Sequence, residues 1–185
     1  MKTKSASIVF IISVLSFSCI DKGQTAEVLF GKDVKAIAEY VETSDMVNVK
    51  EFIDPVTGVS VIWQEVSSSG VKVVIGDTIA TNYTGRLLND VVFDSSIEAV
   101  AKANNIFNSQ RRYGPLRIRT STANSRSGVI PGFEYGLIQL ERGDKATILI
   151  PSELAYGNEA RQGIPQNSVL IFEVELLEVK AGPKL

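Results

Sequence analysis

The side chains that usually carry out enzyme chemistry are scarce in this sequence of 185 residues. It contains no histidine and a single cysteine, Cys19. These counts exclude zinc sites built on histidine or on several cysteines, nucleophiles activated by histidine, and an internal disulfide. Neither Glu153 nor Glu159 has an evident acidic partner for general acid–base catalysis, and we interpret both as solvated. The chain must therefore act by shape, desolvation and hydrogen bonding, or only bind.

The composition is that of an ordinary globular protein, with 44% hydrophobic and 22% charged residues. This usage excludes a wholly disordered chain, a collagen and a coiled coil. The length suffices for one domain with a sizeable core and a small extension. The formal net charge of −2 gives no electrostatic case for a nucleic-acid partner.

The first residues have the layout of a secretory signal. Two lysines precede a 12-residue apolar run that ends at Phe17 and is too short to span a bilayer as a helix. The junction at Cys19 resembles that of a bacterial lipoprotein, in which the cysteine is lipidated and becomes the mature N-terminus. We therefore expect a signal peptide over residues 1–18, a lipidated Cys19 with a tether over residues 19–30, and an exported protein anchored to a membrane, facing the periplasm or the cell surface. The alternative is a plain signal peptide with an incidental cysteine.

The rest of the chain combines two helix patterns with several strand patterns. Residues 32–44 place apolar side chains at i, i+3, i+4 and i+7, which predicts an amphipathic helix packed against its own domain, with a dimer contact as the alternative. A short helix is predicted over residues 132–140, because Pro131 suits its first turn. β-branched and aromatic residues predict strands over 59–66, 71–75, 78–83, 91–93, 116–119, 146–150 and 169–179. Many strands around one short central helix indicate an α+β domain with an antiparallel sheet.

The pattern breaks down between residues 97 and 127. Residues 97–107 allow a short helix, and residues 121–127 are small and polar, as is typical of a mobile loop. Five arginines fall in this stretch, at positions 111, 112, 117, 119 and 126. We interpret them as parts of a solvated loop and strand edge; a docking surface for acidic partners is the alternative.

From about Thr57 to Lys180, the sequence resembles the FKBP-type peptidyl-prolyl cis–trans isomerases. Any one of the matching motifs is weak, but six of them in family order are highly specific. They are NYTG at 82–85, FDSS at 93–96, GVIPGF at 128–133, ELAYG at 153–157, GIP at 163–165 and LIFEVELL at 170–177.

The resemblance implies a fold and a set of boundaries. The fold is a half-barrel sheet of five or six antiparallel strands, wrapped around the short helix that begins near Pro131. A proline-binding pocket is implied between that helix and the sheet. Its extent implies an isomerase domain over 56–180 with a long insertion at about 97–127. The helix pattern then places a helical extension over 31–55 before this domain, and a tail over 181–185 follows it.

The same resemblance assigns the residues of the pocket. Four are implied to be catalytic: Tyr83, Asp94, Ile130 and Tyr156. Six others are implied to bind the substrate: Phe93, Leu116, Val129, Phe133, Ile164 and Phe172. Taken alone, most of these residues would be ordinary core, whereas a buried carboxylate or phenol such as Asp94 or Tyr156 needs a polar partner.

The implied reaction suits these residue types. An X–Pro bond isomerises slowly because a partial double bond must twist, against a barrier of about 18–20 kcal/mol. No bond breaks, so no metal, cofactor or nucleophile is required. A dry aromatic pocket favours the twisted amide, whose carbonyl is less polar, over the planar amide bonded to water. In this scheme the Tyr156 hydroxyl and the Ile130 N–H hold substrate carbonyls, and Asp94 orients Tyr83 and polarises the site.

Three features depart from the family pattern. Phe133 stands where members commonly have tryptophan, the segment 163–167 is about one residue shorter than usual, and the stretch 97–127 is longer. The resemblance implies a monomeric isomerase that assists the folding of exported proteins, with proline-containing polypeptides as partners and macrolides as candidate ligands. The alternatives are a peptide-binding or chaperone module with little isomerase activity, and a structural component of a surface complex.

Overall fold

The computed structural model describes residues 25–123 and 125–183. The predicted signal segment 1–18, Cys19, the tether up to residue 24 and the last two residues of the tail lie outside this part of the chain. Within the described ranges, no helix combines the length and the apolar character needed to cross a membrane. The elements follow in the order α1 (Ala26–Thr43), β1 (Lys50–Ile53), β2 (Ser60–Glu65), β3 (Thr78–Leu87), β4 (Val92–Ser95), α2 (Glu98–Ala103), β5 (Leu116–Arg119), α3 (Pro131–Leu137), β6 (Lys145–Ile150), the 3₁₀ helix η2 (Ser152–Leu154) and β7 (Leu170–Lys180).

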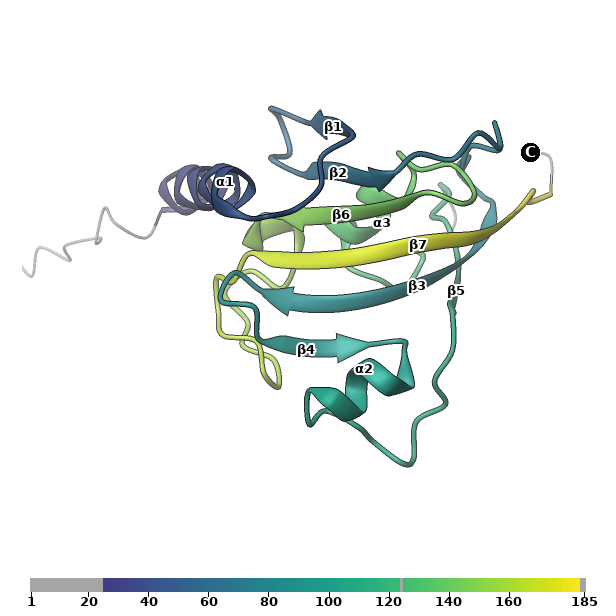
Figure 1. Cartoon of the computed structure of the whole chain (residues 1–185). Coiled ribbons are helices and arrows are strands. Elements are labelled where there is room, and N and C mark those ends of the chain that lie inside the picture. Colours follow the sequence, from purple (N-terminus) through teal and green to yellow (C-terminus); the bar gives the residue numbers. More distant parts are fainter. Residues whose placement is uncertain (1–24, 124, 184–185) are drawn as a thin grey trace, which may run out of the picture.

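One antiparallel sheet organises the chain (Figure 1). Its seven strands within the described residues run in the order β1-β2-β6-β7-β3-β4, and β5 also pairs with β3. Because β7 takes one edge of β3 along its whole length, β4 and β5 share the other edge, opposite Thr84–Arg86 and Thr78–Thr81 respectively. The predicted α+β class with an antiparallel sheet is confirmed. The sheet has more strands than expected, because β1 lies in the segment predicted to be a helical extension.

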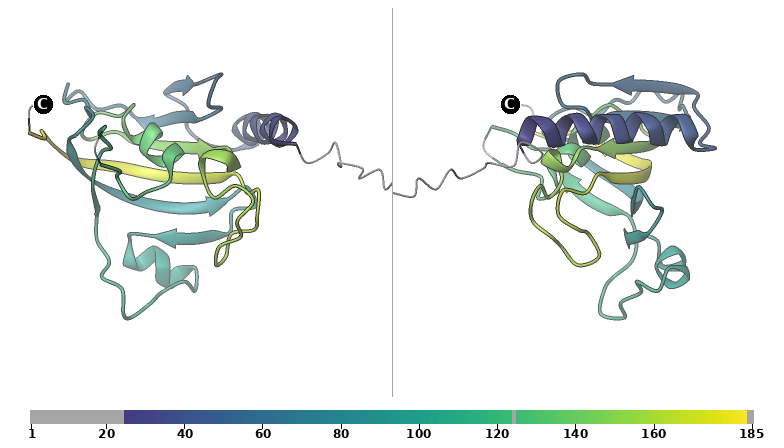
Figure 2. Two further views of the ribbon diagram at one scale, coloured as in Figure 1. Left: turned by 180° about the vertical axis from the view of Figure 1, so that it is seen from behind. Right: turned by 90° about the vertical axis from the view of Figure 1, so that its left-hand side faces the viewer.

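Helix α3 lies against one face of the sheet, as the view from behind shows (Figure 2). Two glycines make this close approach possible. A Cβ atom at Gly132 would lie 2.3 Å from Ile150 Cγ2, and one at Gly136 would lie 2.4 Å from Ile148 Cγ2. The main core fills the space between α3 and the sheet, and it includes Trp63, which is 1% exposed.

Helix α1 covers the opposite face of the sheet. Its Ile37 packs with Ile62, Leu149 and Ile171, which point away from the α3 side of their strands. Thr25 caps the helix by accepting a hydrogen bond from the Val28 N–H, so α1 begins at Ala26, six residues before the predicted start. The prediction of a tether up to residue 30 is therefore wrong for residues 26–30, which are helical.

Two other predicted segments differ from the structure. Residues 71–75 form no strand, because this segment bonds to the turn after α3 rather than to the sheet: Val73 N–H donates to Leu140 O, and Arg142 N–H donates to Val71 O. The expected insertion at 97–127 contains β5, whose Ile118 is buried. The excursion proper is therefore residues 97–115, which leave the sheet after β4 and return as β5 (Figure 1).

Candidate functional site

A pocket of about 420 Å³ opens between the start of α3 and the sheet. Every pocket residue predicted from the motifs lines it, with the exception of Ile164. Two residues beside the predicted ones, Gly128 and Pro131, complete the lining. The predicted residues that line it are Tyr83, Phe93, Asp94, Leu116, Val129, Ile130, Phe133, Tyr156 and Phe172.

Ile164 does not line this pocket. A tight turn pairs the backbones of Arg161 and Ile164 in both directions, at 2.8 and 2.9 Å. This turn places the Ile164 side chain in the main core, where it is 6% exposed. Ile164 thus packs in the same core as the pocket rings of Phe133 and Phe172, and its expected place in the pocket lining is corrected.

Four aromatic rings form the walls of the pocket. Phe133 and Phe172 lie 4.6 Å apart between ring centroids, and Tyr83 meets the edge of Phe133 at 5.9 Å. Phe93 packs edge-on against Phe172 at 5.7 Å. These rings come from β3, β4, α3 and β7, so the wall exists only when the sheet and α3 are assembled.

A glycine beneath the rings explains part of the NYTG motif. A Cβ atom at Gly85 would lie 2.6 Å from the Phe93 ring and 2.9 Å from the Phe172 ring. Real Cβ atoms do not approach other atoms this closely, so any other residue here would displace the two rings. The motif glycine is thus required by the aromatic wall that covers it.

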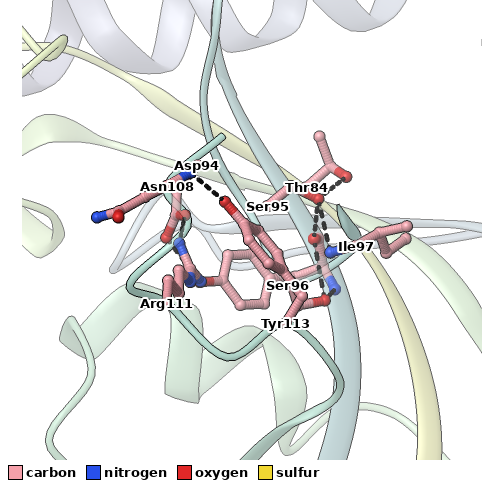
Figure 3. A network of polar contacts seen from close by, with 9 residues as sticks. Thr84, Asp94, Ser95, Ser96, Ile97, Asn108, Arg111 and Tyr113 are labelled. Atoms are coloured by element: carbon pink, nitrogen blue, oxygen red, sulfur yellow. Dashed lines mark hydrogen bonds and ion pairs between the residues drawn. The ribbon is translucent and has the colours of Figure 1, made fainter. Parts of the chain in front are cut away.

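Three polar side chains meet on one side of the pocket. The Tyr83 hydroxyl donates to Asp94 Oδ2 at 2.6 Å, and Arg111 Nη2 donates to the same hydroxyl oxygen at 2.9 Å. Arg111 Nη1 also contacts Asp94 Oδ1 (Figure 3). Burial and the bond to Asp94 raise the pKa of Tyr83 to about 12, against the opposing charge of Arg111. The phenol therefore stays protonated at neutral pH and continues to donate its hydrogen bond to Asp94.

The two serines after Asp94 hold this group in place. Ser96 Oγ accepts the Tyr83 N–H at 2.9 Å, and Ser95 Oγ donates to the Tyr83 carbonyl at 3.0 Å. Ser95 Oγ also bonds to the Thr84 hydroxyl at 3.0 Å (Figure 3). Both serines are buried. The FDSS motif thus combines a wall residue, a carboxylate and two hydroxyls that lock β4 to β3.

Arg111 is the site residue that the sequence did not identify. Arg111 is exposed, as the interpretation of the five arginines as solvated expects, but its guanidinium also bonds to two pocket residues, which that interpretation did not include. Arg117 of β5 pairs with Glu178 of β7 at 2.8 Å, and both side chains are more than half exposed, as the interpretation requires. The only available signal was the cluster of arginines itself, because 17 positions separate Arg111 from Asp94.

Two further residues that line the pocket carry polar groups, Ile130 a backbone N–H and Tyr156 a phenol hydroxyl. Ile130 is the N-cap of α3 and is extended, with φ −63° and ψ 144°, and its carbonyl accepts from the Phe133 N–H. Its own N–H donates to no acceptor among the described residues. Tyr156 lines the pocket, and the Arg161 guanidinium lies 5.4 Å from its ring centroid. The pocket thus offers an amide donor and a phenol at its rim.

The loop beside the pocket entrance is fastened to α3. Glu134 accepts hydrogen bonds from the Ser121 N–H, from the Ser121 hydroxyl at 2.7 Å and from the Ser127 hydroxyl at 2.6 Å. Burial opposes ionisation of this carboxyl, but the three donors outweigh it and lower the pKa of Glu134. Both ends of the polar segment 121–127 are therefore tied to the helix that forms one side of the pocket.

A larger groove, of about 830 Å³, lies on the other face of the sheet near the end of α1. Its floor includes Glu173 and Glu175, which alternate with the pocket residue Phe172 along β7 and so point the opposite way. Arg86 pairs there with Glu173 at 2.8 Å. This groove is lined largely by charged and polar side chains, whereas the smaller pocket is lined largely by aromatic and aliphatic ones.

Comparison with known proteins gives consistent relatives. A profile of the family described as "FKBP-type peptidyl-prolyl cis-trans isomerase" matches residues 70–177. The chain is 42% identical over 108 residues to "FKBP-type peptidyl-prolyl cis-trans isomerase FkpA" of Escherichia coli, a match that covers 58% of this chain and 33% of the relative. It is 36% identical over 116 residues to "FK506-binding protein 2" of Candida glabrata, covering 62% of this chain and 73% of the relative. The chain thus spans about a third of the length of the bacterial relative.

Solved structures agree with the fold. The crystal structure of FkpA from Escherichia coli matches with a TM-score of 0.56 and 28% identity, over 84% of this chain and 64% of the other. A peptidyl-prolyl cis-trans isomerase from Pseudomonas syringae has the same fold, with a TM-score of 0.58 at 23% identity, over 85% of this chain and 98% of the other. The matched region holds the whole aromatic pocket with its Tyr83–Asp94 pair, and the chain belongs to the FKBP-type peptidyl-prolyl cis-trans isomerase family.

Proposed function

We propose that this protein is a peptidyl-prolyl cis–trans isomerase that acts on exported proteins, with the pocket between α3 and the sheet as its active site. The observation that carries the proposal is that buried aromatic rings form the wall of the pocket, while its polar side chains gather on one side. Phe133 and Phe172 are 3% and 7% exposed, while Tyr83 and Asp94 are joined by a 2.6 Å hydrogen bond beside them. Family membership supports the reaction class.

In the proposed mechanism the substrate proline enters between the aromatic rings. Its preceding carbonyl leaves water and loses polarity as the amide twists, so the rings favour the twisted state over the planar one. The Ile130 N–H and the Tyr156 hydroxyl hold neighbouring substrate carbonyls and fix the peptide on either side of the rotating bond. The Tyr83–Asp94 pair, neutralised by Arg111, supplies the local field on the polar side. No proton transfer is needed, because no bond breaks.

The test is a prolyl-isomerisation assay on the mature protein, obtained by expressing the full sequence in a bacterium. Peptides that differ in the residue before proline are compared for the parent, Asp94→Ala and Tyr156→Phe. Hydrogen bonds to a charged group are worth about 1.5–3 kcal/mol, so we expect roughly 10- to 100-fold loss of kcat/KM in Asp94→Ala. A smaller loss is expected in Tyr156→Phe. Glu39→Gln is the control, because within the described residues its carboxylate pairs with Lys35 on the exposed side of α1, and α1 covers the face of the sheet opposite the pocket.

Each result has a distinct meaning. Acceleration by the parent that neither substitution reduces would show that the residue assignment is wrong. A folded parent that accelerates no peptide would leave a peptide-binding or chaperone module on the same fold. In that case, suppression of aggregation of an unfolded client, measured by light scattering, would be the activity to compare among the same variants.

Binding of a macrolide follows as a second consequence of the same pocket. The relative from Candida glabrata carries the name FK506-binding protein 2. We extend that ligand to this chain, since the rings and the Ile130 N–H offer an apolar slot with one amide donor. FK506 is expected to compete with the peptide substrate and to lose affinity in the Phe133→Ala variant. Calorimetry measures both effects directly.

Export and lipid anchoring are proposed from the N-terminal segment, which lies outside the described residues. The apolar run ends just before the single cysteine, so a lipid on Cys19 would hold the domain at a membrane through a short polar segment. The Cys19→Ser variant is expected to leave the membrane fraction and appear in the soluble fraction of the envelope. Mass spectrometry of the parent would show the added acyl groups; an unmodified cysteine would instead indicate a plain signal peptide.

A further inference from the structure

The excursion between β4 and β5 is a folded structure in its own right. Its ends meet where the Gly114 N–H donates to the Ser96 carbonyl at 2.9 Å. α2 packs inward through Ala101, which is 1% exposed. The described residues between these points make a series of ring contacts rather than a loose loop.

Four side chains of the excursion form a column that ends at the pocket. Lys102 Nζ lies 4.9 Å from the Phe107 ring centroid, and the Phe107 ring stacks on Tyr113 at 5.5 Å with 14° between their planes. Arg111 Cζ lies 5.3 Å from the centroid of Tyr113. The same guanidinium then contacts Asp94 (Figure 3). It also donates a hydrogen bond to the Tyr83 hydroxyl.

The Tyr113 ring is itself fixed within this column. Its hydroxyl accepts the Asn108 N–H at 2.9 Å, which ties the ring to the backbone of the turn. The Tyr113 ring stacks on Phe107, which is 42% exposed. Phe107 belongs neither to the main core between α3 and the sheet nor to the cluster that packs under α1. An aromatic side chain that contributes little to a core serves here to support its neighbour.

The ion pair alone does not explain the position of Arg111. The side chains of Arg111 and Asp94 are 36% and 35% exposed, and water weakens the attraction of a pair in such contact with it. A free arginine side chain also loses rotamer entropy when it is held in one geometry. A stacking ring restricts the guanidinium in advance and adds cation–π attraction.

We propose that Tyr113 is a positioning residue of the isomerase site: its ring holds the Arg111 guanidinium on the Tyr83 hydroxyl and Asp94. The inference rests on the proposed isomerase function and assigns a task to the longer excursion of this chain. The excursion supplies one member of the polar side of the pocket and keeps it oriented by aromatic stacking. Tyr113 itself touches no substrate in this scheme.

The neighbouring residue provides a matched control. Arg112 carries the same charge one position along, is exposed, and makes no ion pair or ring contact within the described ranges. If charge in the excursion were all that mattered, Arg112→Gln and Arg111→Gln would have equal effects. If position matters, only Arg111→Gln should affect the site.

A double-mutant cycle separates positioning from general stability. Tyr113→Leu is expected to lower kcat/KM about two- to fivefold in the parent, which corresponds to the cation–π contribution, and to have no further effect in the Arg111→Gln background. Tyr113→Phe keeps the ring and should retain most of the activity, and Arg112→Gln should match the parent. A loss from Tyr113→Leu that is equal in both backgrounds, or absent from the parent, would overturn the proposal.

A second readout does not depend on catalysis. In protein labelled with [¹³Cζ]tyrosine, the Tyr83 resonance is assigned by its absence in Tyr83→Phe. Loss of the bond from Arg111 changes this resonance, so Tyr113→Leu should shift it in the same direction as Arg111→Gln, while Arg112→Gln leaves it in place. An unshifted resonance in Tyr113→Leu would overturn the positioning role even in a fully active enzyme. A shifted resonance in a protein without isomerase activity would uphold the contact and reject the proposed function alone.

Discussion

The carboxylate of Asp33 in α1 accepts two hydrogen bonds from Ser152, which opens η2 119 positions later in the chain. The Ser152 N–H donates at 2.9 Å and its hydroxyl at 2.6 Å, and both residues are buried. η2 directly follows β6 and precedes the pocket residue Tyr156. Helix α1 is therefore joined to the domain by a buried polar contact as well as by its apolar face.

The first prediction concerns this contact. In Asp33→Ala, the Ser152 N–H and hydroxyl would be buried without an acceptor, so we expect a loss of about 1–3 kcal/mol in the free energy of unfolding. Glu39→Ala on the same helix is the control, because its pair with Lys35 spans 3.5 Å and is exposed, and it should cost less than about 1 kcal/mol. Urea unfolding followed by the fluorescence of Trp63, the one tryptophan of the sequence, measures both. Equal losses would contradict the assigned role of Asp33.

The second prediction concerns the glycine under the aromatic wall. Gly85→Ala would drive a Cβ atom into the Phe93 and Phe172 rings, so we expect weaker peptide binding and a lower kcat/KM. Gly31→Ala in α1 is the matched control, because nothing lies within 4 Å of its added Cβ atom, and it should stabilise the protein by about 0.5–1 kcal/mol. Peptide titration and urea unfolding separate the two effects. A Gly85→Ala variant with parental binding would show that the wall adapts at no cost.

Much of the fold follows from local pattern. The strand at Leu116–Arg119 has the predicted bounds, and β7 differs from the prediction by one residue at each end, because β-branched and apolar runs of this length have few alternatives. Residues 71–75 had the same pattern but bond to a turn, which no local signal could reveal. β1 carries two charged residues in four and becomes a strand only by pairing with β2. In both segments, contacts with residues distant in the sequence determine whether a strand forms.

The candidate site likewise contains residues that a local motif predicts and residues that it does not. Residues inside a motif, such as Phe93 and Asp94, meet at the pocket as the motif order predicted, because strand pairing fixes their positions. Ile164 also sits in a motif, but the turn at Arg161 directs it into the core. Arg111 sits in no motif and contacts Asp94 from an excursion that contains the Phe107–Tyr113 stack. Such a contact between distant positions leaves no periodic signal in one sequence.

The third prediction is a flat pH profile. The pKa of Tyr83 is raised to about 12, so its hydroxyl keeps its proton and continues to donate to Asp94 at lower pH. The sequence also has no histidine to titrate near neutrality. We therefore expect kcat/KM to be constant between about pH 7 and about pH 9, below the ordinary pKa of a tyrosine at about 10. A loss of activity centred near pH 10 that disappears in Tyr83→Phe would contradict this assignment.

The last prediction concerns the fastening of the 121–127 loop to α3 by Glu134. The pKa of Glu134 is lowered in the folded protein, since three donors outweigh its burial, so this contact stabilises the fold above the unfolded pKa of about 4.5 and is lost as the pH falls through the lower folded value. Glu134→Gln should therefore cost about 1 kcal/mol at pH 7, the low end for bonds to a partly exposed charged group. The difference from the parent should narrow in acid, because the parent carboxyl is then protonated as well. Urea unfolding at pH 7 and pH 3.5 tests this; a difference of the same size at both values would mean that the carboxylate charge contributes nothing to holding the loop.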